Sequence, residues 1–264
     1  MPDSWYGDVS DRNQAFQTLI MDLFLCLDAG NSRQKLAVFH GERMMYFQVE
    51  KEFSIEQLTK VLDRFPVSAA MLCEVKSLNK PIKNFLRKKV RLLEMSHRLR
   101  LPVRNEYRTP ETLGKDRLAA AAGAVRLYPG EAVLIIGLGT CITYDFVSGR
   151  GVYRGGAISP GLDMRFRAMH DFTEKLPLVK FDPKAALLGN STTTALQAGA
   201  VWGMTLELQG MIERYRKKYK NLKVILAGGG ADFFKKRLKK PIFAHPNLVL
   251  LGLNEVLSLN VLET

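Results

Sequence analysis

The sequence of 264 residues contains little cysteine and no long apolar run. Its three cysteines, Cys26, Cys73 and Cys141, are far apart and odd in number, so they form neither a disulfide framework nor a metal-binding spacing. No apolar run approaches the ~18 residues that a membrane-spanning helix needs. Residues 1–20 lack the basic start and apolar centre of a secretory signal. We therefore expect a protein with no membrane span that works in the cytoplasm.

Acidic residues are scarce relative to basic ones, and the net charge is +13. The densest basic groups lie in or directly after segments with helical apolar spacing, which is typical of solvated helix faces. These groups are "RKK" from Arg87, "RYRKKYKNLK" from Arg214 and "KKRLKK" from Lys235. The sequence has no zinc-finger spacing, no RNA-binding aromatic motif and no heptads joined to a basic region. The charge pattern therefore disfavours a nucleic-acid partner.

Two common phosphate-binding motifs are also missing. No G-x-x-x-x-G-K-[ST] occurs, and "GLGTCI" has Ile142 where a dinucleotide-binding loop has its third glycine. The sequence instead contains one pattern in two copies: an apolar run, a turn of small residues and a second apolar run. The copies are "LFLCLDAGNSRQKLAVF" (Leu23–Phe39) and "VLIIGLGTCITYD" (Val133–Asp145). Asp28 of the first copy aligns with Gly137 of the second.

The secondary structure expected around the two copies is also duplicated. Strands are predicted at 23–27, 35–39 and 44–49, and again at 132–136, 141–147 and 152–157. Helices and further strands alternate after each set, including a long helix over 192–218. The pattern predicts an α/β protein with two tandem halves, residues 21–128 and 129–264, and residues 1–20 as an N-terminal extension.

A turn of small residues between two strands lets backbone N–H groups approach an anion closely, because glycine has no Cβ in the way. Gly228, Gly229 and Gly230 form a third place of this kind before a predicted helix. Each loop alone can be an ordinary hairpin turn. Two matching loops and a glycine triplet in one duplicated chain favour phosphate binding.

Four stretches resemble those of type III pantothenate kinases, within the superfamily of actin-like proteins and acetate or sugar kinases. They are "DAGNSRQK" (Asp28–Lys35), "NEYRTPETLGKDRLAAAAGA" (Asn105–Ala124), "GGAISPGLDMRFRAMHDFTEKLP" (Gly155–Pro177) and "LGNSTTTALQAGAVWG" (Leu188–Gly203). The resemblance runs from Met21 to about Leu259. It implies two ribonuclease-H-like halves with ATP in the cleft between them. The implied reaction is phosphorylation of pantothenate to 4′-phosphopantothenate, the first step of coenzyme A biosynthesis.

The resemblance also implies the residues that contact ATP. The expected contacts to its phosphates are Asp28, Gly30, Asn31, Ser32, Lys35, Gly139, Thr140, Gly228 and Gly229. Asp28 would hold Mg²⁺, directly or through water, because this ion prefers oxygen ligands. Lys35 lies in the second strand, where it could reach a β- or γ-phosphate or remain a solvated strand-end lysine.

Asp116 and Arg117 open a predicted helix, where the helix dipole favours a charged carboxylate. Asp116 is the expected catalytic residue, since transfer of a phosphoryl group to an alcohol needs a proton acceptor. Arg117 could bind the carboxylate of pantothenate bidentately. An N-terminal Asp beside a surface Arg is otherwise common, and the resemblance decides between these interpretations. It also adds Tyr107, Gly114, Lys115 and Thr192 to the expected substrate contacts.

Gly137 is where this sequence departs from the family. The family has an Asp here that binds a monovalent cation, K⁺ or NH₄⁺, so the expected cation dependence is in doubt. One alternative is a family member with weakened or lost kinase activity and an accessory or regulatory role. Another is a different small-molecule kinase on the same fold, which the intact stretch Asn105–Arg117 disfavours. The resemblance further implies a homodimer, for which the helix at 192–218 offers an apolar stripe that could equally be core.

Overall fold

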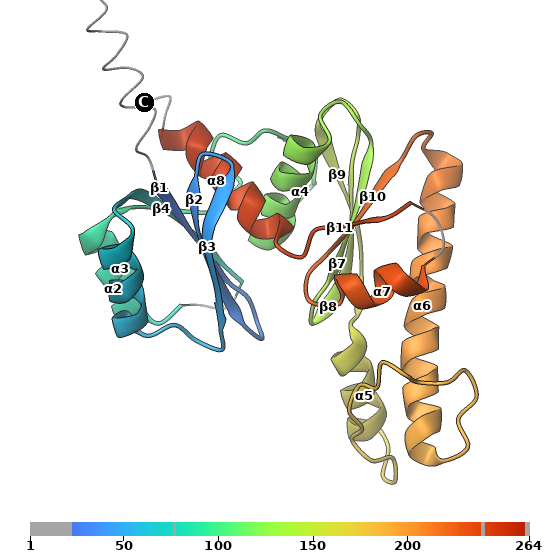
Figure 1. Ribbon diagram of the computed structural model, residues 1–264. Coiled ribbons are helices and arrows are strands. Elements are labelled where there is room, and N and C mark those ends of the chain that lie inside the picture. Colours follow the sequence, from blue (N-terminus) through green and yellow to red (C-terminus); the bar gives the residue numbers. More distant parts are fainter. Residues whose placement is uncertain (1–22, 76–77, 239–240, 262–264) are drawn as a thin grey trace, which may run out of the picture. The chain divides into compact units, whose positions relative to one another are not determined.

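A computed structural model describes residues 23–75, 78–238 and 241–261, and the expected extension at 1–20 lies outside them. The chain divides into two compact units between Glu94 and Met95. Each unit is built on one mixed β-sheet with helices packed against it (Figure 1).

The first unit contains a five-stranded sheet. In spatial order its strands are β3 (Arg43–Glu50), β2 (Gln34–His40), β1 (Leu23–Ala29), β4 (Val67–Glu74) and β5 (Arg91–Glu94). β1, β2 and β3 are antiparallel neighbours, whereas β4 and β5 continue the sheet parallel to β1. Helices α2 (Ile55–Arg64) and α3 (Lys80–Lys89) contribute to one shared hydrophobic core with the strands.

Local sequence explains several boundaries in this unit. Gly41 in the sequence "HGER" (His40–Arg43) has φ +56°, a conformation that glycine adopts without a steric cost, and it joins β2 to β3. Ser54 caps α2: its hydroxyl accepts a hydrogen bond from the Gln57 backbone N–H, and the Gln57 side chain accepts one from the Ser54 N–H. This reciprocal pair satisfies two donors that the first turn of a helix leaves open.

The second unit contains a six-stranded sheet with the same central arrangement. In spatial order its strands are β11 (Phe243–Ala244), β10 (Lys223–Ala227), β7 (Val133–Leu138), β8 (Cys141–Val147), β9 (Val152–Pro160) and β6 (Arg104–Asn105). β7, β8 and β9 form an antiparallel meander, and β10 runs parallel to β7. The unit's helices are α4 (Lys115–Leu127), α5 (Leu162–Asp171), α6 (Thr192–Lys218), α7 (Ala231–Arg237) and α8 (Leu248–Val261).

Side chains of β8 alternate between the two faces of this sheet, as the period of a strand requires. Ile142, Tyr144 and Phe146 pack into the core that α6 and α7 complete. Thr143 and Asp145 therefore lie on the other face, toward α4. The polar residues of this strand thus share the face on which the predicted substrate helix packs.

Helix α4 packs so closely on α8 that side chains between them are excluded. A Cβ on Gly252 would lie 1.7 Å from the carbonyl oxygen of Ala119, and one on Gly123 would lie 2.6 Å from that of Leu248. Residues 117–124 are all buried, which explains the alanine-rich sequence of the helix. The start of α4, which carries the predicted catalytic residue, is thereby fixed in the second unit (Figure 1).

The internal repeat and the packing place the boundary differently. The sequence repeat predicts halves that meet at 128/129, whereas the compact units divide at 94/95, because residues 95–128 pack with the second sheet. β6 joins β9, and α4 contacts β7, β8 and α8. The strands and helices expected from the sequence are otherwise present, and α6 spans the predicted range 192–218. Helices α5 and α8 and the two-residue strands β6 and β11 were not among the predicted elements.

The apolar stripe of α6 belongs to the core of its own unit. Met204 and Leu208 pack against the sheet, and Leu196 and Ala200 pack against α5. The N-terminal half of α6 extends beyond the sheet together with α5 and the segment that joins them (Figure 1). The sequence left two roles open for this apolar stripe, a dimer surface or the core. The structure places it in the core.

Basic groups lie in the last turns of three helices, α3, α6 and α7. Positive side chains are favourable there because the carbonyl end of a helix carries partial negative charge. In the described part of the chain, no helix is both long and apolar enough to cross a bilayer.

Candidate active site

Asp116 is held at the start of α4 by the backbone around it. Its Oδ1 accepts a hydrogen bond from the backbone N–H of Arg117 at 2.9 Å. The same oxygen lies over Gly114, where an added Cβ would approach it to 2.7 Å. Gly114 therefore makes room for the carboxylate, which gives a steric reason for a glycine two residues before Asp116.

Burial is the main cause of a raised pKa for Asp116. The charge of Asp145 raises the pKa further, whereas the hydrogen bond from the Arg117 N–H and the Arg117 charge lower it. A carboxylate with a raised pKa is a better proton acceptor than an exposed one. The position of Asp116 at a helix start predicted a lowered pKa, because the helix dipole favours the charged carboxylate. Burial has the larger effect and raises the pKa instead.

Arg117 is not a surface residue, because its side chain is only 7% exposed and forms an ion pair with Asp145, which is 1% exposed. Nε and Nη2 of Arg117 both donate to Oδ1 of Asp145, at 2.9 and 2.7 Å. The hydroxyl of Tyr153 donates to the same oxygen at 2.6 Å. Three donors from α4 and β9 thus converge on one carboxylate oxygen of β8.

The pair carries opposite charges in a buried setting. Burial acts to lower the pKa of Arg117, but the hydrogen bonds and charge of Asp145 outweigh it and raise that pKa, so the guanidinium stays protonated. Burial raises the pKa of Asp145, and Arg117, Tyr153 and Thr143 oppose that rise through hydrogen bonds. Nη1 of Arg117 is the guanidinium nitrogen outside the contacts with Asp145.

Tyr107 covers the guanidinium of Arg117. The Arg117 Cζ lies 5.8 Å from the centre of the Tyr107 ring, a cation–π distance, and the two side chains also form a hydrogen bond. Gly155, with φ +87°, leaves space for this ring, since a Cβ there would lie 3.0 Å from it. The structure therefore brings together Tyr107, Gly114, Asp116 and Arg117 of the predicted substrate contacts.

The predicted phosphate-binding residues of the second unit also meet. Gly228 has φ +85°, and a Cβ on it would lie 2.7 Å from the carbonyl oxygen of Leu138. The turn at 228–230 therefore lies directly against the loop that contains Gly139 and Thr140. Gly139 and Gly229 are exposed, and nothing lies within 4 Å of a Cβ built on Gly229. Their backbones are accessible to a phosphate.

In the first unit, Asp28 and Lys35 are cross-strand neighbours on β1 and β2, beside the loop that contains Gly30, Asn31 and Ser32. Burial lowers the pKa of Lys35, the Asp28 charge opposes this and the Arg33 charge adds to it. Among the residues that the structure describes, no group of three or more His, Cys, Asp or Glu could hold a metal. Mg²⁺ at kinase sites needs only one or two carboxylates besides phosphates and water. A single carboxylate at Asp28 therefore fits the expected ion.

Gly137 occupies the position in β7 that Asp28 occupies in β1, and its cross-strand neighbour is Thr143. A Cβ on residue 137 would lie 2.6 Å from the hydroxyl oxygen of Thr143. The Thr143 hydroxyl also forms a hydrogen bond with Asp145. A threonine hydroxyl thus fills the space into which a side chain at residue 137 would project, and this position does not fit a carboxylate-bound monovalent cation.

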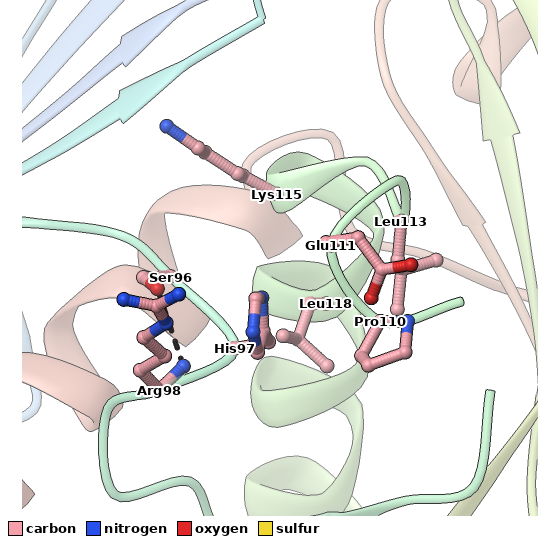
Figure 2. A pocket seen from close by; sticks show the side chains of 8 residues that line it. All are labelled: Ser96, His97, Arg98, Pro110, Glu111, Leu113, Lys115 and Leu118. Atoms are coloured by element: carbon pink, nitrogen blue, oxygen red, sulfur yellow. Dashed lines mark hydrogen bonds between the residues drawn. The ribbon is translucent and has the colours of Figure 1, made fainter. Parts of the chain in front are cut away.

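Two further predicted substrate contacts are Lys115 and Thr192. Lys115 lines a cavity of about 240 Å³ at the start of α4, with Ser96, His97, Arg98, Pro110, Glu111, Leu113 and Leu118. Figure 2 shows the Lys115 side chain extending away from His97 and Leu118. Thr192 is exposed at the first position of α6, and Ser191 rather than Thr192 caps the helix.

Sequence reasoning missed the role of Asp145 and left the residue unassigned. It also gave no role to Thr143, Tyr153 or the glycines of β9. One signal was available: Asp145 is a charged residue inside a strand whose neighbours Tyr144 and Phe146 are apolar. A carboxylate in a buried strand needs partners to compensate for its burial, and those partners come from elements distant in sequence.

A profile of the family described as type III pantothenate kinase matches residues 24–214. The type III pantothenate kinase of Christiangramia forsetii is 44% identical over 239 residues, which cover 89% of this chain and 98% of the relative. The chain belongs to the type III pantothenate kinase family. The type III pantothenate kinase of Phocaeicola vulgatus is likewise 44% identical over 238 residues, with coverage of 89% and 98%.

Solved structures support the fold of this family member. A conserved putative Baf family transcriptional activator from Campylobacter jejuni aligns with a TM-score of 0.57 and 19% identity, covering 89% of this chain and 97% of that one. The ethanolamine utilization protein EutJ from Carboxydothermus hydrogenoformans aligns with a TM-score of 0.50 and 14% identity, covering 89% of each chain. At such identities the likeness concerns the fold alone. It agrees with two tandem α/β halves of the actin-like type.

Proposed function

We propose that this family member transfers the γ-phosphoryl group of ATP to the hydroxyl of pantothenate, the first step of coenzyme A biosynthesis. Membership of the family supports the reaction, and the placement of Asp116 carries it. This carboxylate is fixed over Gly114, partly buried and raised in pKa, beside a buried arginine. ATP as the phosphoryl donor makes the cytoplasm the expected compartment.

Asp116 accepts the proton of the substrate hydroxyl as that oxygen attacks phosphorus. Burial favours this step because it raises the affinity of the carboxylate for a proton. Arg117 lies next to Asp116 in the helix, and Arg117 and Tyr107 bind the carboxylate end of pantothenate. The substrate is then held at one end and deprotonated at the other, which is the positioning that phosphoryl transfer requires.

Backbone N–H groups near Gly30, Gly139 and Gly229 bind phosphate oxygens of ATP in this proposal, and Lys35 adds a positive charge. Mg²⁺, when bound, neutralises part of the charge on the transferring phosphate. Asp28 is the residue that would hold this ion, directly or through water. The glycines allow the phosphates to approach the backbone, because no Cβ stands in the way.

We expect no dependence on K⁺ or NH₄⁺ through residue 137. Gly137 offers no carboxylate, and the Thr143 hydroxyl fills the adjacent space. A missing Asp and a missing cation cancel in net charge, so the phosphates experience a similar local field. Turnover in Na⁺ should then match turnover in K⁺ at the same ionic strength.

A homodimer in which α6 of one copy completes the pocket of the other is also part of the proposal. Thr192, the first residue of α6, is exposed, and the N-terminal half of this helix extends beyond the sheet (Figure 1). Four apolar side chains in the segment between α5 and α6 are 53–88% exposed: Phe172, Leu178, Leu187 and Leu188. Burying such surface against a second copy would be favourable.

The proposed reaction is tested by incubating the pure full-length chain with ATP and Mg²⁺ and following ADP. Pantothenate, several sugars and short nucleic acids serve as separate acceptors or effectors. Pantothenate-dependent ADP formation with a phosphorylated product supports the proposal. Turnover with a sugar alone would indicate another kinase, and no turnover with any acceptor would favour an accessory or regulatory role.

A further inference from the structure

Asp145 is a buried carboxylate to which the proposed reaction assigns no step. Its residue exposure is 1%, although it lies on the sheet face next to the substrate helix. Nε and Nη2 of Arg117 and the hydroxyl of Tyr153 all donate to its Oδ1. Burying a carboxylate is costly in free energy unless the carboxylate is paired. The three donors around Oδ1 therefore compensate for a large desolvation cost at Asp145.

The backbone of β9 is shaped to build this cluster. The register between β8 and β9 shifts between Asp145 and Val147, so the strand pair has an irregularity next to the carboxylate. Gly156 faces Asp145 across the strands, and a Cβ on it would lie 1.5 Å from the carbonyl oxygen of Tyr144. This close approach leaves no room for a side chain at residue 156, and the neighbouring Gly155 leaves space for the ring of Tyr107. Both glycines therefore serve the arrangement around Arg117.

We propose that Asp145 is a positioning residue of the substrate site. It fixes the guanidinium of Arg117 through Nε and Nη2, which leaves Nη1 outside the pair, and it balances the Arg117 charge beside Asp116. This inference rests on the proposed function, since it assigns the fixed arginine to the substrate carboxylate and Asp116 to the proton transfer.

The charge balance affects Asp116 in a definite direction. The charged groups that act on it are Arg117 from its own helix and Asp145 from β8. Removing the charge of Asp145 removes a repulsion and leaves the positive charge of Arg117 uncompensated. Both changes favour the ionised form of Asp116, so its pKa falls and it becomes a weaker proton acceptor.

Asp145→Asn in the full-length protein tests the proposal by three measurements. The dissociation constant for pantothenate, measured by calorimetry, should rise about tenfold or more, because a charged hydrogen-bonded contact that positions the arginine is lost. The affinity for ATP should stay the same. The acid limb of kcat/KM against pH should move to lower pH, which a merely structural defect would not produce.

Tyr144→Phe is the matched control. Tyr144 is the neighbouring residue of β8 on the opposite face, and its hydroxyl donates to Oε1 of Glu207 at 2.8 Å. The change removes a hydrogen bond between tyrosine and carboxylate from the same strand, so it reports loss of stability alone. Its pantothenate affinity and pH profile should match those of the parent.

A double variant shows whether Asp145 affects pantothenate binding through Arg117 or by direct contact with the substrate. Asp145→Asn should have little further effect on pantothenate affinity when Arg117→Gln is already present, since the positioned group is then gone. If Asp145→Asn alone fails to fold, Tyr153→Phe replaces it, because that change weakens the hold on Oδ1 and keeps both charges. It should raise the pantothenate dissociation constant in the same direction by a smaller factor.

The outcomes distinguish this inference from the proposed function. A parent protein without pantothenate-dependent turnover overturns both. A parent that is active, with an Asp145→Asn variant that keeps the parent's pantothenate affinity and pH profile, overturns the positioning role alone. The positioning role is also overturned if the effects of Asp145→Asn and Arg117→Gln simply add, or if Tyr153→Phe leaves affinity unchanged when Asp145→Asn does not fold.

Discussion

Gly137→Ala should destabilise the second unit, although replacing a glycine inside a strand by alanine ordinarily stabilises a protein. The new Cβ would lie 2.6 Å from the Thr143 hydroxyl oxygen but 3.8 Å from the Thr143 Cβ. The second distance is an ordinary van der Waals contact, whereas the first is far below one. Only the hydroxyl has to move, and rotating it away breaks its hydrogen bond with Asp145.

The size of the effect follows from these contacts. A hydrogen bond to a charged group contributes about 1.5–3 kcal/mol. Replacing glycine by alanine increases the free energy of unfolding by about 0.4–1 kcal/mol, because it lowers the conformational entropy of the unfolded chain. The net loss is then roughly 0.5–2.5 kcal/mol, which corresponds to a fall in Tm of about 1–10 °C for a unit of this size.

Thermal unfolding of four proteins measures the coupling: the parent, Gly137→Ala, Thr143→Ala and the double variant. In the Thr143→Ala background the hydroxyl is absent, so Gly137→Ala should be neutral or slightly stabilising. Equal losses in both backgrounds would refute the contact with Thr143 as the cause.

The same contact determines whether cation dependence can be introduced. Gly137→Asp alone has to displace Thr143, and we expect K⁺ to stimulate turnover only when Gly137→Asp is combined with Thr143→Ala. The measurement is turnover in K⁺ and Na⁺ at fixed ionic strength. Strong stimulation of the parent by K⁺ would contradict this account of residue 137.

Three further predictions concern catalysis and assembly. Asp116→Asn should lower turnover at least ~10²-fold and leave ATP binding intact; a change of only a few-fold in steady-state assays would remove Asp116 as the proton acceptor. Because burial raises the pKa of Asp116, kcat/KM should fall on the acid side with a midpoint above the ordinary value of 3.8, and a midpoint at or below that value would be contrary evidence. Light scattering should give about twice the chain mass of 29.7 kDa, and Leu188→Asp should shift the mass toward the monomer; a fully active monomeric parent would refute the shared pocket.

The sequence was a good guide to the elements and to their order. The duplicated hairpins were predictable because each combines two apolar runs with a turn that only small residues permit, as at Gly30 and Gly139. The Ser54 capping box and the bounds of α6 also follow from neighbouring residues. Asp116 and Gly114 could be paired from sequence because they are two residues apart and touch through local backbone geometry.

Other features depended on contacts between residues far apart in sequence. The division at 94/95 could not be read from the repeat, since it is set by the packing of α4 against β7, β8 and α8. The stripe of α6 was compatible with either core or interface until the structure placed Met204 and Leu208 in the core. Periodicity shows that a helix has an apolar face but does not identify what covers it.

By itself the sequence determined which chemical groups this protein carries and in which local settings: the glycine turns, the helix that begins at Gly114 and the missing carboxylate at Gly137. Only the tertiary structure decided how charge is compensated. It paired Arg117 with Asp145, 28 residues away, and placed the Thr143 hydroxyl against Gly137. The physical reason is that burial makes an isolated charge costly, so its partner is determined by which strands and helices fold together.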